Sequence, residues 1–308
     1  MHAVPGWRDL PPDFRGASLA LGNFDGVHRG HVAVLNAALD AGAHIGAPGA
    51  AAVFDPHPRA YFQPDAPPFR LMSAAQRDRA LAAAGLTRVH VLPFDADLAA
   101  MTPETFVNQV LVEGLGAKNV AVGADFRFGA GRAGDGPLLA RLCAQAQVGC
   151  VLVRPLGAAD EKYASSGVRA ALRAGEPERA AAILGRPWAI EGAVQQGDQR
   201  GRLLGFPTAN IGLGDYLRAR FGVYVVDVQC EAIGLRARGV ANLGERPTVG
   251  GTEARLEVHV FDFDGDLYGR TLDVALVSFL RGERRFDGLA ALKAQIAEDA
   301  ARARSFPA

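Results

Sequence analysis

The pattern of apolar runs changes near residue 185, and this change constrains the fold more than any other feature. Before it, short runs that favour strands alternate with Ala- and Leu-rich stretches that favour helices, as in residues 18–21, 30–41 and 51–54. The alternation continues through residues 88–92, 103–115, 119–122, 137–146 and 150–153. Strands separated by helices predict right-handed crossovers and a parallel sheet, so we expect an α/β domain in the first half.

A Gly-Arg-Pro break at residues 185–187 predicts a domain boundary. A helical pair over residues 165–184 precedes the break, and strands joined by glycine-containing turns follow it. These strands cover residues 188–195, 223–230, 237–240, 256–263 and 271–279. Without intervening helices they predict an antiparallel β-barrel or sandwich, and an apolar stripe predicts a terminal helix over residues 286–304. We expect two domains, residues 1–184 and 185–308.

The charge balance argues against two classes of partner. The 33 Lys and Arg residues equal the 33 Asp and Glu residues, and each predicted domain is also neutral. A protein that binds nucleic acid without sequence preference needs a basic excess. The longest uncharged apolar run, residues 41–54, is shorter than the roughly 20 residues of a membrane-spanning helix. We therefore expect neither nucleic acid nor a membrane as a partner.

The cysteines and the N-terminal residues predict a cytoplasmic location. Cys143, Cys150 and Cys230 form an odd set, which favours reduced thiols over a disulfide framework. Prolines and charges within residues 1–15 leave no room for the apolar stretch of a signal peptide.

A glycine-rich turn with two histidines, residues 22–31, follows the first predicted strand and runs directly into a helix. Such a turn directs backbone N–H groups and the positive end of the helix dipole to one point, where anionic phosphates bind. His28 and His31 can both face that point, and Gly30 lets a phosphate approach the backbone closely. A metal site formed by these two histidines with His57 is the competing interpretation.

Residues 22–31 resemble the first motif of the HxGH nucleotidyltransferases, and more narrowly that of bacterial bifunctional riboflavin kinase/FMN adenylyltransferases, also called FAD synthetases. Residues 54–59, 122–129 and 164–169 follow in the order that this family shows. In the last of these segments, Ala164, Ser166 and Val168 depart from the family's Ser-Ser-Thr-x-Ile-Arg pattern. The resemblance implies a Rossmann-like first domain and a riboflavin kinase-like barrel.

The resemblance also implies which residues of the first domain bind ATP and flavin. His28, His31 and Arg169 would act as catalytic groups on the triphosphate. The ATP site would further contain Gly22, Phe24, Gly30, Ser165 and Ser166. The flavin site would contain Phe62, Asp125 and Phe128, although a place in the core is an equal alternative for both phenylalanines.

A second glycine-rich segment, residues 197–210, stands out in the second half. Its glycines permit a loop whose N–H groups wrap an anion, and Thr208 and Asn210 offer two neutral oxygens suited to Mg²⁺. A tight-turned barrel loop explains the pattern nearly as well. The segment closely resembles the riboflavin kinase signature. This resemblance implies a phosphate loop with Gly201, Arg202 and Gly205, and a metal site at Thr208 and Asn210.

Residues 256–260 alternate apolar and polar side chains, which places Glu257 on the polar face of a strand. Such a glutamate is usually solvated. In the family that the chain resembles, the glutamate of this strand acts as the base toward the primary hydroxyl of the flavin. Asn242 belongs to another segment that matches the family, residues 239–248.

The resemblance as a whole implies one polypeptide with two transferase activities. One domain would phosphorylate riboflavin with ATP and Mg²⁺ to FMN, and the other would adenylylate FMN with ATP to FAD and pyrophosphate. Two alternatives remain: a single-activity FMN adenylyltransferase whose barrel only binds flavin, and a barrel that binds single-stranded nucleic acid beside an inactive α/β domain. The glycines at 129, 131 and 134 begin too far after a strand to form a nicotinamide-binding turn.

Overall fold

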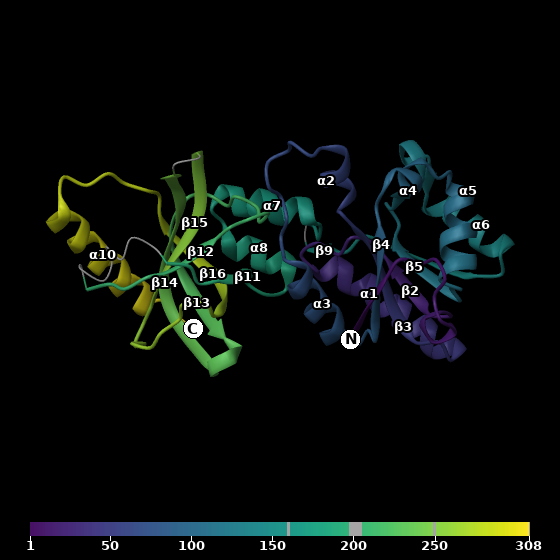
Figure 1. The fold of residues 1–308 in the computed structure, drawn as a ribbon, viewed down its shortest axis with the longest axis horizontal. Coiled ribbons are helices and arrows are strands. Elements are labelled where there is room, and N and C mark those ends of the chain that lie inside the picture. Colours follow the sequence, from purple (N-terminus) through teal and green to yellow (C-terminus); the bar gives the residue numbers. More distant parts are fainter. Residues whose placement is uncertain (159–160, 197–204, 249–250, 308) are drawn as a thin grey trace. The chain divides into compact units, whose positions relative to one another are not determined.

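The computed structural model describes residues 1–158, 161–196, 205–248 and 251–307 (Figure 1). The chain divides into two compact units. The first unit comprises Met1–Ala66 and Ala74–Ala164, and the second comprises Pro67–Ser73 and Ser165–Ala308. The predicted boundary after residue 184 refers to catalytic domains and stays a prediction.

The first unit contains a six-stranded sheet with the order β1-β4-β3-β2-β5-β8, in which every neighbouring pair is parallel. The prediction of an α/β fold with a parallel sheet is confirmed. The strands are β1 (His2–Pro5), β2 (Ser18–Leu21), β3 (Gly49–Asp55), β4 (Arg88–Pro93), β5 (Asn119–Gly123) and β8 (Gly149–Val153). Strand β1 was not predicted, so the strand before the histidine turn is the second along the chain.

Helices connect these strands. They are α1 (Arg29–Ile45), α2 (Pro58–Phe62), α3 (Ala74–Ala83), α4 (Ala96–Ala100), α5 (Pro103–Thr105) and α6 (Gly136–Gln145). The helix expected over residues 103–115 consists of the short α5 and a π-helix, Phe106–Gly114. Small elements complete the unit: the short helices Pro12–Phe14 and Ala130–Arg132, and the two-residue strands β6 (Arg127–Phe128), β7 (Gly134–Asp135), β9 (Gly157–Ala158) and β10 (Glu161–Lys162).

The core of the first unit lies between the sheet and the helices that cover it. Leu19, Val120 and Val122 of the central strands are fully buried and belong to one apolar cluster with the π-helix residues Val107 and Leu111. The strand residues of β2 are all buried, as expected for a parallel sheet covered on both faces. This packing holds the carboxyl ends of β2 and β5 rigidly beside each other.

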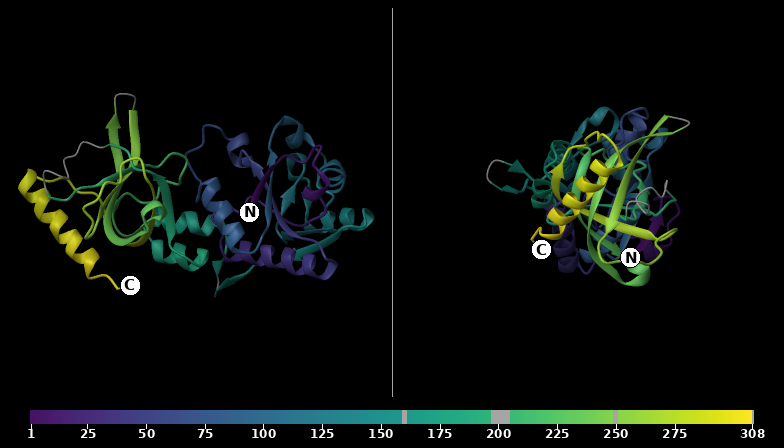
Figure 2. Two further views of the ribbon diagram at one scale, coloured as in Figure 1. Left: turned by 60° about the horizontal axis from the view of Figure 1, so that its bottom comes forward. Right: turned by 90° about the vertical axis from the view of Figure 1, so that its left-hand side faces the viewer.

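The second unit contains a six-stranded sheet with the order β11-β16-β13-β14-β15-β12, in which every neighbouring pair is antiparallel. The edge strands β11 and β12 meet at a bridge between Gln195 and Asn210, where Gln195 N donates to Asn210 O at 2.8 Å. The sheet therefore curls into a nearly closed barrel, as Figure 2 shows, and this prediction is confirmed. The strands are β11 (Trp188–Ala193), β12 (Ala209–Gly212), β13 (Gly222–Cys230), β14 (Leu235–Thr248), β15 (Gly251–Val260) and β16 (Thr271–Arg281).

Two helices and an inserted segment complete one side of the second unit. The helices α7 (Ser165–Ala174) and α8 (Pro177–Leu184) confirm the predicted helical pair. The inserted segment is Pro67–Ser73, which comes from the middle of the first unit's sequence. Trp188 donates to the carbonyl of Leu71 at 2.6 Å, and Leu217 N donates to the carbonyl of Arg70 at 2.8 Å, so the barrel holds this segment by specific contacts.

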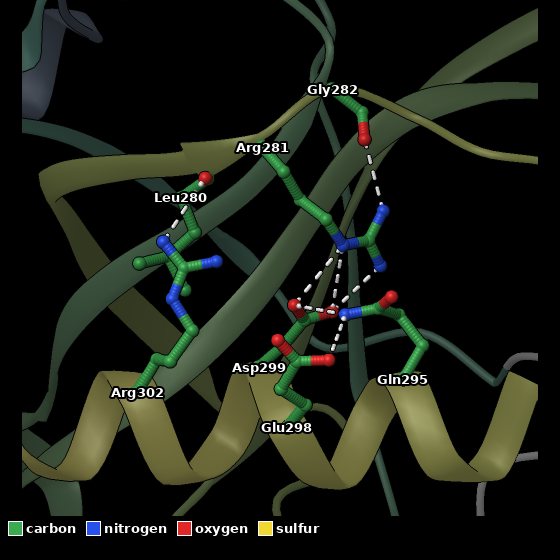
Figure 3. Close-up of polar contacts among 7 residues, drawn as sticks. All are labelled: Leu280, Arg281, Gly282, Gln295, Glu298, Asp299 and Arg302. Atoms are coloured by element: carbon green, nitrogen blue, oxygen red, sulfur yellow. Dashed lines mark hydrogen bonds and ion pairs between the residues drawn. The ribbon is translucent and has the colours of Figure 1, made fainter.

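The predicted terminal helix is present as α10 (Leu289–Arg304), although it begins at residue 289 instead of 286, and its buried residues are not those of the predicted apolar stripe. Leu289 is 69% exposed, and the buried residues of α10 are Asp299, Ala300 and Ala303. Figure 3 shows that the carboxylate of the buried Asp299 faces the guanidinium of Arg281 on β16. No helix in the described ranges is long and apolar enough to cross a membrane.

Candidate active sites

The histidine turn lies at the switch point of the parallel sheet. From β2 the chain passes through α1 to β3 on one side, and it later returns to β5 on the other side. Ligands of open α/β sheets bind at the carboxyl ends of strands at such a point. Residues 22–28 after β2 and residues 124–126 after β5 leave the sheet there, and Asp125 lies close enough to His28 for their charges to interact.

The two histidines form a stacked pair. His28 caps the N-terminus of α1, and its Nδ1 accepts a hydrogen bond from His31 N at 3.2 Å. The two rings stack with 3.6 Å between their centroids, and Phe24 places its ring edge on His31 at 5.2 Å. Since Nδ1 of His28 accepts, its neutral ring carries the proton on Nε2. The pair thus combines a defined imidazole N–H donor with the positive end of α1.

The backbone of the turn is strained. Phe24 and Val27 adopt positive φ angles of 51° and 39°, and the intervening Gly26 has a φ of 93°. A positive φ costs a non-glycine residue about 1–3 kcal/mol, and Val27 is β-branched, which makes its conformation rarer still. The side chains of Phe24 and Val27 are 1% and 3% exposed, so their burial holds the strained turn in place.

The structure gives a reason for glycine at position 30 other than the expected close approach of a phosphate. A Cβ at this position would lie 2.7 Å from the carbonyl oxygen of Tyr163 and 3.1 Å from the His28 ring. The absence of a side chain therefore lets the start of α1 pack against residue 163 and leaves room for the His28 imidazole. At Gly22, an added Cβ would touch the Phe24 ring at 3.4 Å.

Three residues of this region were not singled out from the sequence. Asn23 carries a buried side-chain oxygen, Oδ1, that has no hydrogen-bond partner among the described residues, and such an acceptor fits a donor group of a ligand. Lys162 forms an ion pair with Asp125, and this hydrogen bond lowers the pKa of the Asp125 carboxyl below its ordinary value, with a smaller contribution from His28. Phe126 stacks parallel to Phe128 at 5.7 Å.

The three residues expected at the flavin differ in position. Asp125 is exposed in the loop after β5. Phe62, at the end of α2, is 64% exposed and packs edge-on against Tyr61 and Phe94 at 5.1 and 5.7 Å. Phe128 is only 6% exposed and belongs to the core cluster, which matches the alternative that the sequence left open for it.

Ser165, Ser166 and Arg169 lie on α7, which belongs to the second unit. Ser166 is exposed, and Ser165 and Arg169 are half-buried. Arg169 donates from Nε to the carbonyl of Phe69 at 2.9 Å, and its guanidinium lies 5.5 Å from the centre of the Phe69 ring. The inserted segment Pro67–Ser73 thus sets the orientation of Arg169.

In the barrel, three predicted site residues form one row. Glu257 on β15 lies directly opposite Asn210 on β12 and opposite Asn242 on β14. Residues directly opposite each other in an antiparallel sheet point to the same face, so the carboxylate lies between two amides. Asn210 is buried, and its Nδ2 donates to the carbonyl of Thr208 at 3.4 Å, which leaves Oδ1 as an acceptor.

A cavity of about 500 Å³ adjoins this row. Thr208 and Asn210 line it, whereas Glu257 does not. Its wall is largely apolar and includes two aromatic side chains, Phe263 and Tyr268. The lining residues are Val194, Pro207, Thr208, Ala209, Asn210, Val258, Val260, Phe263, Asp264, Gly265, Asp266, Leu267 and Tyr268. The cavity therefore suits a planar apolar group whose polar end reaches Thr208 and Asn210.

The predicted phosphate loop is described only in part. Gly201 and Arg202 lie outside the described residues. Gly205 has a φ of 87°, and nothing lies within 4 Å of the position of a Cβ there. Glu283, which the sequence analysis did not consider, lies beside Asn242: a Cβ at Gly244 would collide with the Glu283 carboxylate and lie 3.2 Å from Asn242 Nδ2.

The oxygens of Thr208 and Asn210 fit a Mg²⁺ ion that keeps phosphate oxygens and waters as its other ligands. Both are neutral and both line the cavity, Asn210 from β12 and Thr208 from the position directly before β12. For the competing site at His28, His31 and His57, the structure offers little support. His57 caps α2 through its Nδ1, and no cluster of three or more His, Cys, Asp or Glu side chains suited to a metal occurs in the described ranges.

Comparison with known proteins identifies the family. A family model described as FAD synthetase matches residues 10–167, and one described as riboflavin kinase matches residues 184–306. The bifunctional riboflavin kinase/FMN adenylyltransferase of Pseudomonas fluorescens is 40% identical over 309 residues, covering 100% of this chain and 98% of the relative. The protein of the same name from Escherichia coli strain K12 is 42% identical, covering 94% and 93%.

The chain belongs to the bifunctional riboflavin kinase/FMN adenylyltransferase family. A crystal structure titled as a macrolide-efflux protein from Streptococcus pneumoniae is 28% identical, with a TM-score of 0.88 over 100% of both chains. The FAD synthetase match contains the histidine turn and ends just after Ser166, before Arg169. The riboflavin kinase match contains Thr208 and the row of Asn210, Glu257 and Asn242.

Proposed function

We propose that the chain catalyses two successive transfers, with residues 1–184 and 185–308 as the two catalytic domains. Riboflavin and ATP give FMN and ADP in the barrel domain. FMN and a second ATP give FAD and pyrophosphate in the α/β domain. The observation that best supports the proposal is the row of Asn210, Glu257 and Asn242, because in it the Glu257 carboxylate, the proposed base, lies opposite Asn210, one of the two proposed metal ligands.

In the kinase reaction, Glu257 orients the primary hydroxyl of riboflavin and accepts its proton while the γ-phosphoryl group is transferred. The adenine ring of ATP occupies the apolar cavity between β12, β15 and residues 263–268, and the phosphates extend toward Thr208 and Asn210. These two residues hold Mg²⁺. The chemistry that Mg²⁺ supplies when bound is neutralisation of charge on the phosphates.

In the adenylyl transfer, a phosphate oxygen of FMN attacks the α-phosphorus of ATP, and pyrophosphate leaves. No covalent enzyme intermediate is needed, because FMN already carries the nucleophilic oxygen. The imidazole pair of His28 and His31 and the N–H groups at the start of α1 bind the triphosphate and stabilise the charge that develops on it. Arg169 adds a fixed positive charge.

One assay tests the proposal. The purified chain is incubated with riboflavin, ATP and Mg²⁺, and the flavins are separated by chromatography. We expect both FMN and FAD. FAD formed only from added FMN would support the single-activity alternative, and the absence of both products would refute the proposal.

Two variants test the separation of the sites. His31→Ala is expected to stop FAD formation while FMN accumulates. Asn210→Ala is expected to abolish FMN formation from riboflavin while FMN is still converted to FAD. Loss of both activities in either folded variant would contradict the assignment of two separate sites. Repeating the kinase assay with other divalent ions tests the preference for Mg²⁺.

A cytoplasmic location is part of the proposal. It is supported by the three cysteines, Cys143, Cys150 and Cys230, which are all free thiols. Fractionation of producing cells, followed by immunoblotting, tests it. Recovery of the chain in a non-cytoplasmic fraction would contradict this part.

A further inference from the structure

His259 on β15 contacts the segment that precedes the proposed metal ligands. Its Nδ1 lies 2.9 Å from the carbonyl oxygen of Pro207. Its ring also meets the ring of Phe206 edge-on at 5.3 Å and that of Phe261 at 5.7 Å. Because a carbonyl oxygen can only accept, the His259 ring carries a proton on Nδ1 and donates a hydrogen bond to the carbonyl oxygen of Pro207.

The sequence explains why a side chain is needed at this point. The paired residues of β12 and β15 begin with Ala209 opposite Val258. Thr208 and Pro207 precede Ala209 in the chain. Pro207 has no backbone N–H, so it cannot extend the ladder of hydrogen bonds between the two strands. The imidazole of His259 supplies a donor to the Pro207 carbonyl beyond the end of that ladder.

As a result, β15 holds residues 207–210 at both ends. At one end the His259 ring binds Pro207, and at the other end Asn210 pairs with Glu257. Thr208 lies between these two attachment points. Glu257 and His259 are two residues apart on one strand, so they share a face. The position of the Thr208 hydroxyl relative to the Glu257 carboxylate therefore depends on the contact between His259 and Pro207.

Phe261, one of the two aromatic neighbours of the His259 ring, is in turn held by a residue of α10. The guanidinium of Arg304 lies 4.2 Å from the centre of the Phe261 ring and also pairs with Asp262 at 2.8 Å. Phe261 is 4% exposed. A phenylalanine in place of His259 would thus keep its aromatic neighbours on both sides and lose only the N–H donor.

We propose that His259 is a positioning residue of the kinase reaction, which holds Pro207 and Thr208 in register with Glu257. The inference rests on the proposed riboflavin kinase activity. His259 does not touch the reacting atoms. It acts through the start of β12, and a displacement of about 1 Å at a positioned group can reduce a rate by as much as ~100-fold.

Three variants of the full-length chain test the role. His259→Phe keeps the ring packing and removes the donor, and we expect kcat/KM for riboflavin phosphorylation to fall ~10- to 100-fold. His259→Asn places an amide N–H near the position of Nδ1 and is expected to recover most of the activity. Arg255→Met is the matched control, because Arg255 lies on the same face of β15 and pairs with Glu253 instead. Conversion of added FMN to FAD should be unchanged in all three.

Hydrogen–deuterium exchange of the nucleotide-free chain provides a readout that is independent of catalysis. Peptides covering residues 205–212 should exchange faster in His259→Phe than in the wild type, and not in Arg255→Met. Equal exchange in His259→Phe and the wild type, or equal kinase activity in His259→Phe and the wild type, would overturn the inference. So would equal activities of the Phe and Asn variants. Absence of FMN formation by the wild-type chain would instead refute the proposed kinase function.

Discussion

Arg281 and Asp299 form a buried ion pair that joins the last strand of the barrel to the terminal helix. The Nε and Nη2 atoms of Arg281 lie 3.0 and 2.6 Å from Asp299 Oδ2 (Figure 3). The two side chains are 11% and 3% exposed. The pair is completed by Gln295, which donates to Asp299, and by the Gly282 carbonyl, which accepts from Arg281. Each guanidinium nitrogen of Arg281 and each carboxylate oxygen of Asp299 therefore has a hydrogen-bond partner in the folded chain.

Removal of one partner is expected to be costly. Asp299→Ala would leave a buried guanidinium without its carboxylate, and we expect the free energy of unfolding of the second unit to fall by about 3–5 kcal/mol. Urea titration followed by circular dichroism measures this change. Glu298→Ala is the control, because Glu298 is exposed, and it should change stability by no more than about 0.5 kcal/mol. If both variants unfolded at the same urea concentration, the ion pair would not stabilise α10.

Gly30→Ala should damage the adenylyltransferase site. The new Cβ would lie 2.7 Å from the Tyr163 carbonyl oxygen and 3.1 Å from the His28 ring, so one of them must move. We expect a loss of about 1–3 kcal/mol in stability and a marked loss of FAD formation, with FMN formation retained. Gly282→Ala is the matched control, since nothing lies within 4 Å of a Cβ there. Wild-type FAD formation in Gly30→Ala would refute the role of this close packing.

Phe69→Leu should lower the efficiency of FMN adenylylation with little effect on riboflavin phosphorylation. The substitution keeps an apolar side chain in a buried position and removes the ring face under Arg169. A cation–π contact is worth about 0.5–2 kcal/mol, so kcat/KM for ATP in the second reaction should fall ~2- to 30-fold. Phe69→Tyr retains the ring and should behave as the wild type. Equal losses in the Leu and Tyr variants would show that Arg169 does not depend on the ring.

His90 should make the first unit sensitive to acid. It is fully buried on β4, and neither ring nitrogen has a hydrogen-bond partner among the described residues. Burial, with a smaller effect from Arg88, lowers the pKa of His90 from 6.5 to about 4. Between pH 6.5 and pH 4, His90 binds a proton in the unfolded chain but not in the folded chain. The contribution of the neutral, buried His90 to the free energy of unfolding is therefore fully present above pH 6.5 and decreases as the pH falls toward 4.

The size of this effect is about 3 kcal/mol between pH 7 and pH 4, from the difference between the two pKa values. Free energies of unfolding measured across this range should therefore decrease less in His90→Leu than in the wild type. His44→Gln, at an exposed position on α1, serves as the control. Parallel pH profiles for His90→Leu and the wild type would contradict the prediction.

Much of the fold was predictable because local patterns agree with the tertiary structure. Strand β2 matches its predicted bounds, and α7 and α8 fall within the predicted pair. The missed elements have weak local signals. Strand β1 has one histidine and one proline among its four positions, and its pairing with β4 makes it a strand. Strand β12 follows Pro207 and was treated as the end of a loop, and its pairing with β15 makes it a strand.

The candidate site residues, too, were predictable only where the signal lies within a short segment of the sequence. His28 and His31 could be chosen from the sequence because a glycine turn between a strand and a helix is a local arrangement. For Phe128 the sequence could not decide between the core and the flavin site, because no local pattern distinguishes an aromatic residue that packs from one that binds a ligand. The roles of Tyr163, Phe69 and His259 depend on neighbours that are 52 to 133 residues away and are invisible to any local pattern.

By itself, the sequence determined the alternation of strands and helices, the change of pattern near residue 185 and the chemical types of the candidate residues. These depend on residues close together in the chain, whose periodicity and turn propensities act locally. Only the tertiary structure decided that Asn210, Glu257 and Asn242 form one row, that residues 67–73 support Arg169, and that His259 holds Pro207. Strand register and long-range packing are set by the burial of whole faces, which no short segment encodes.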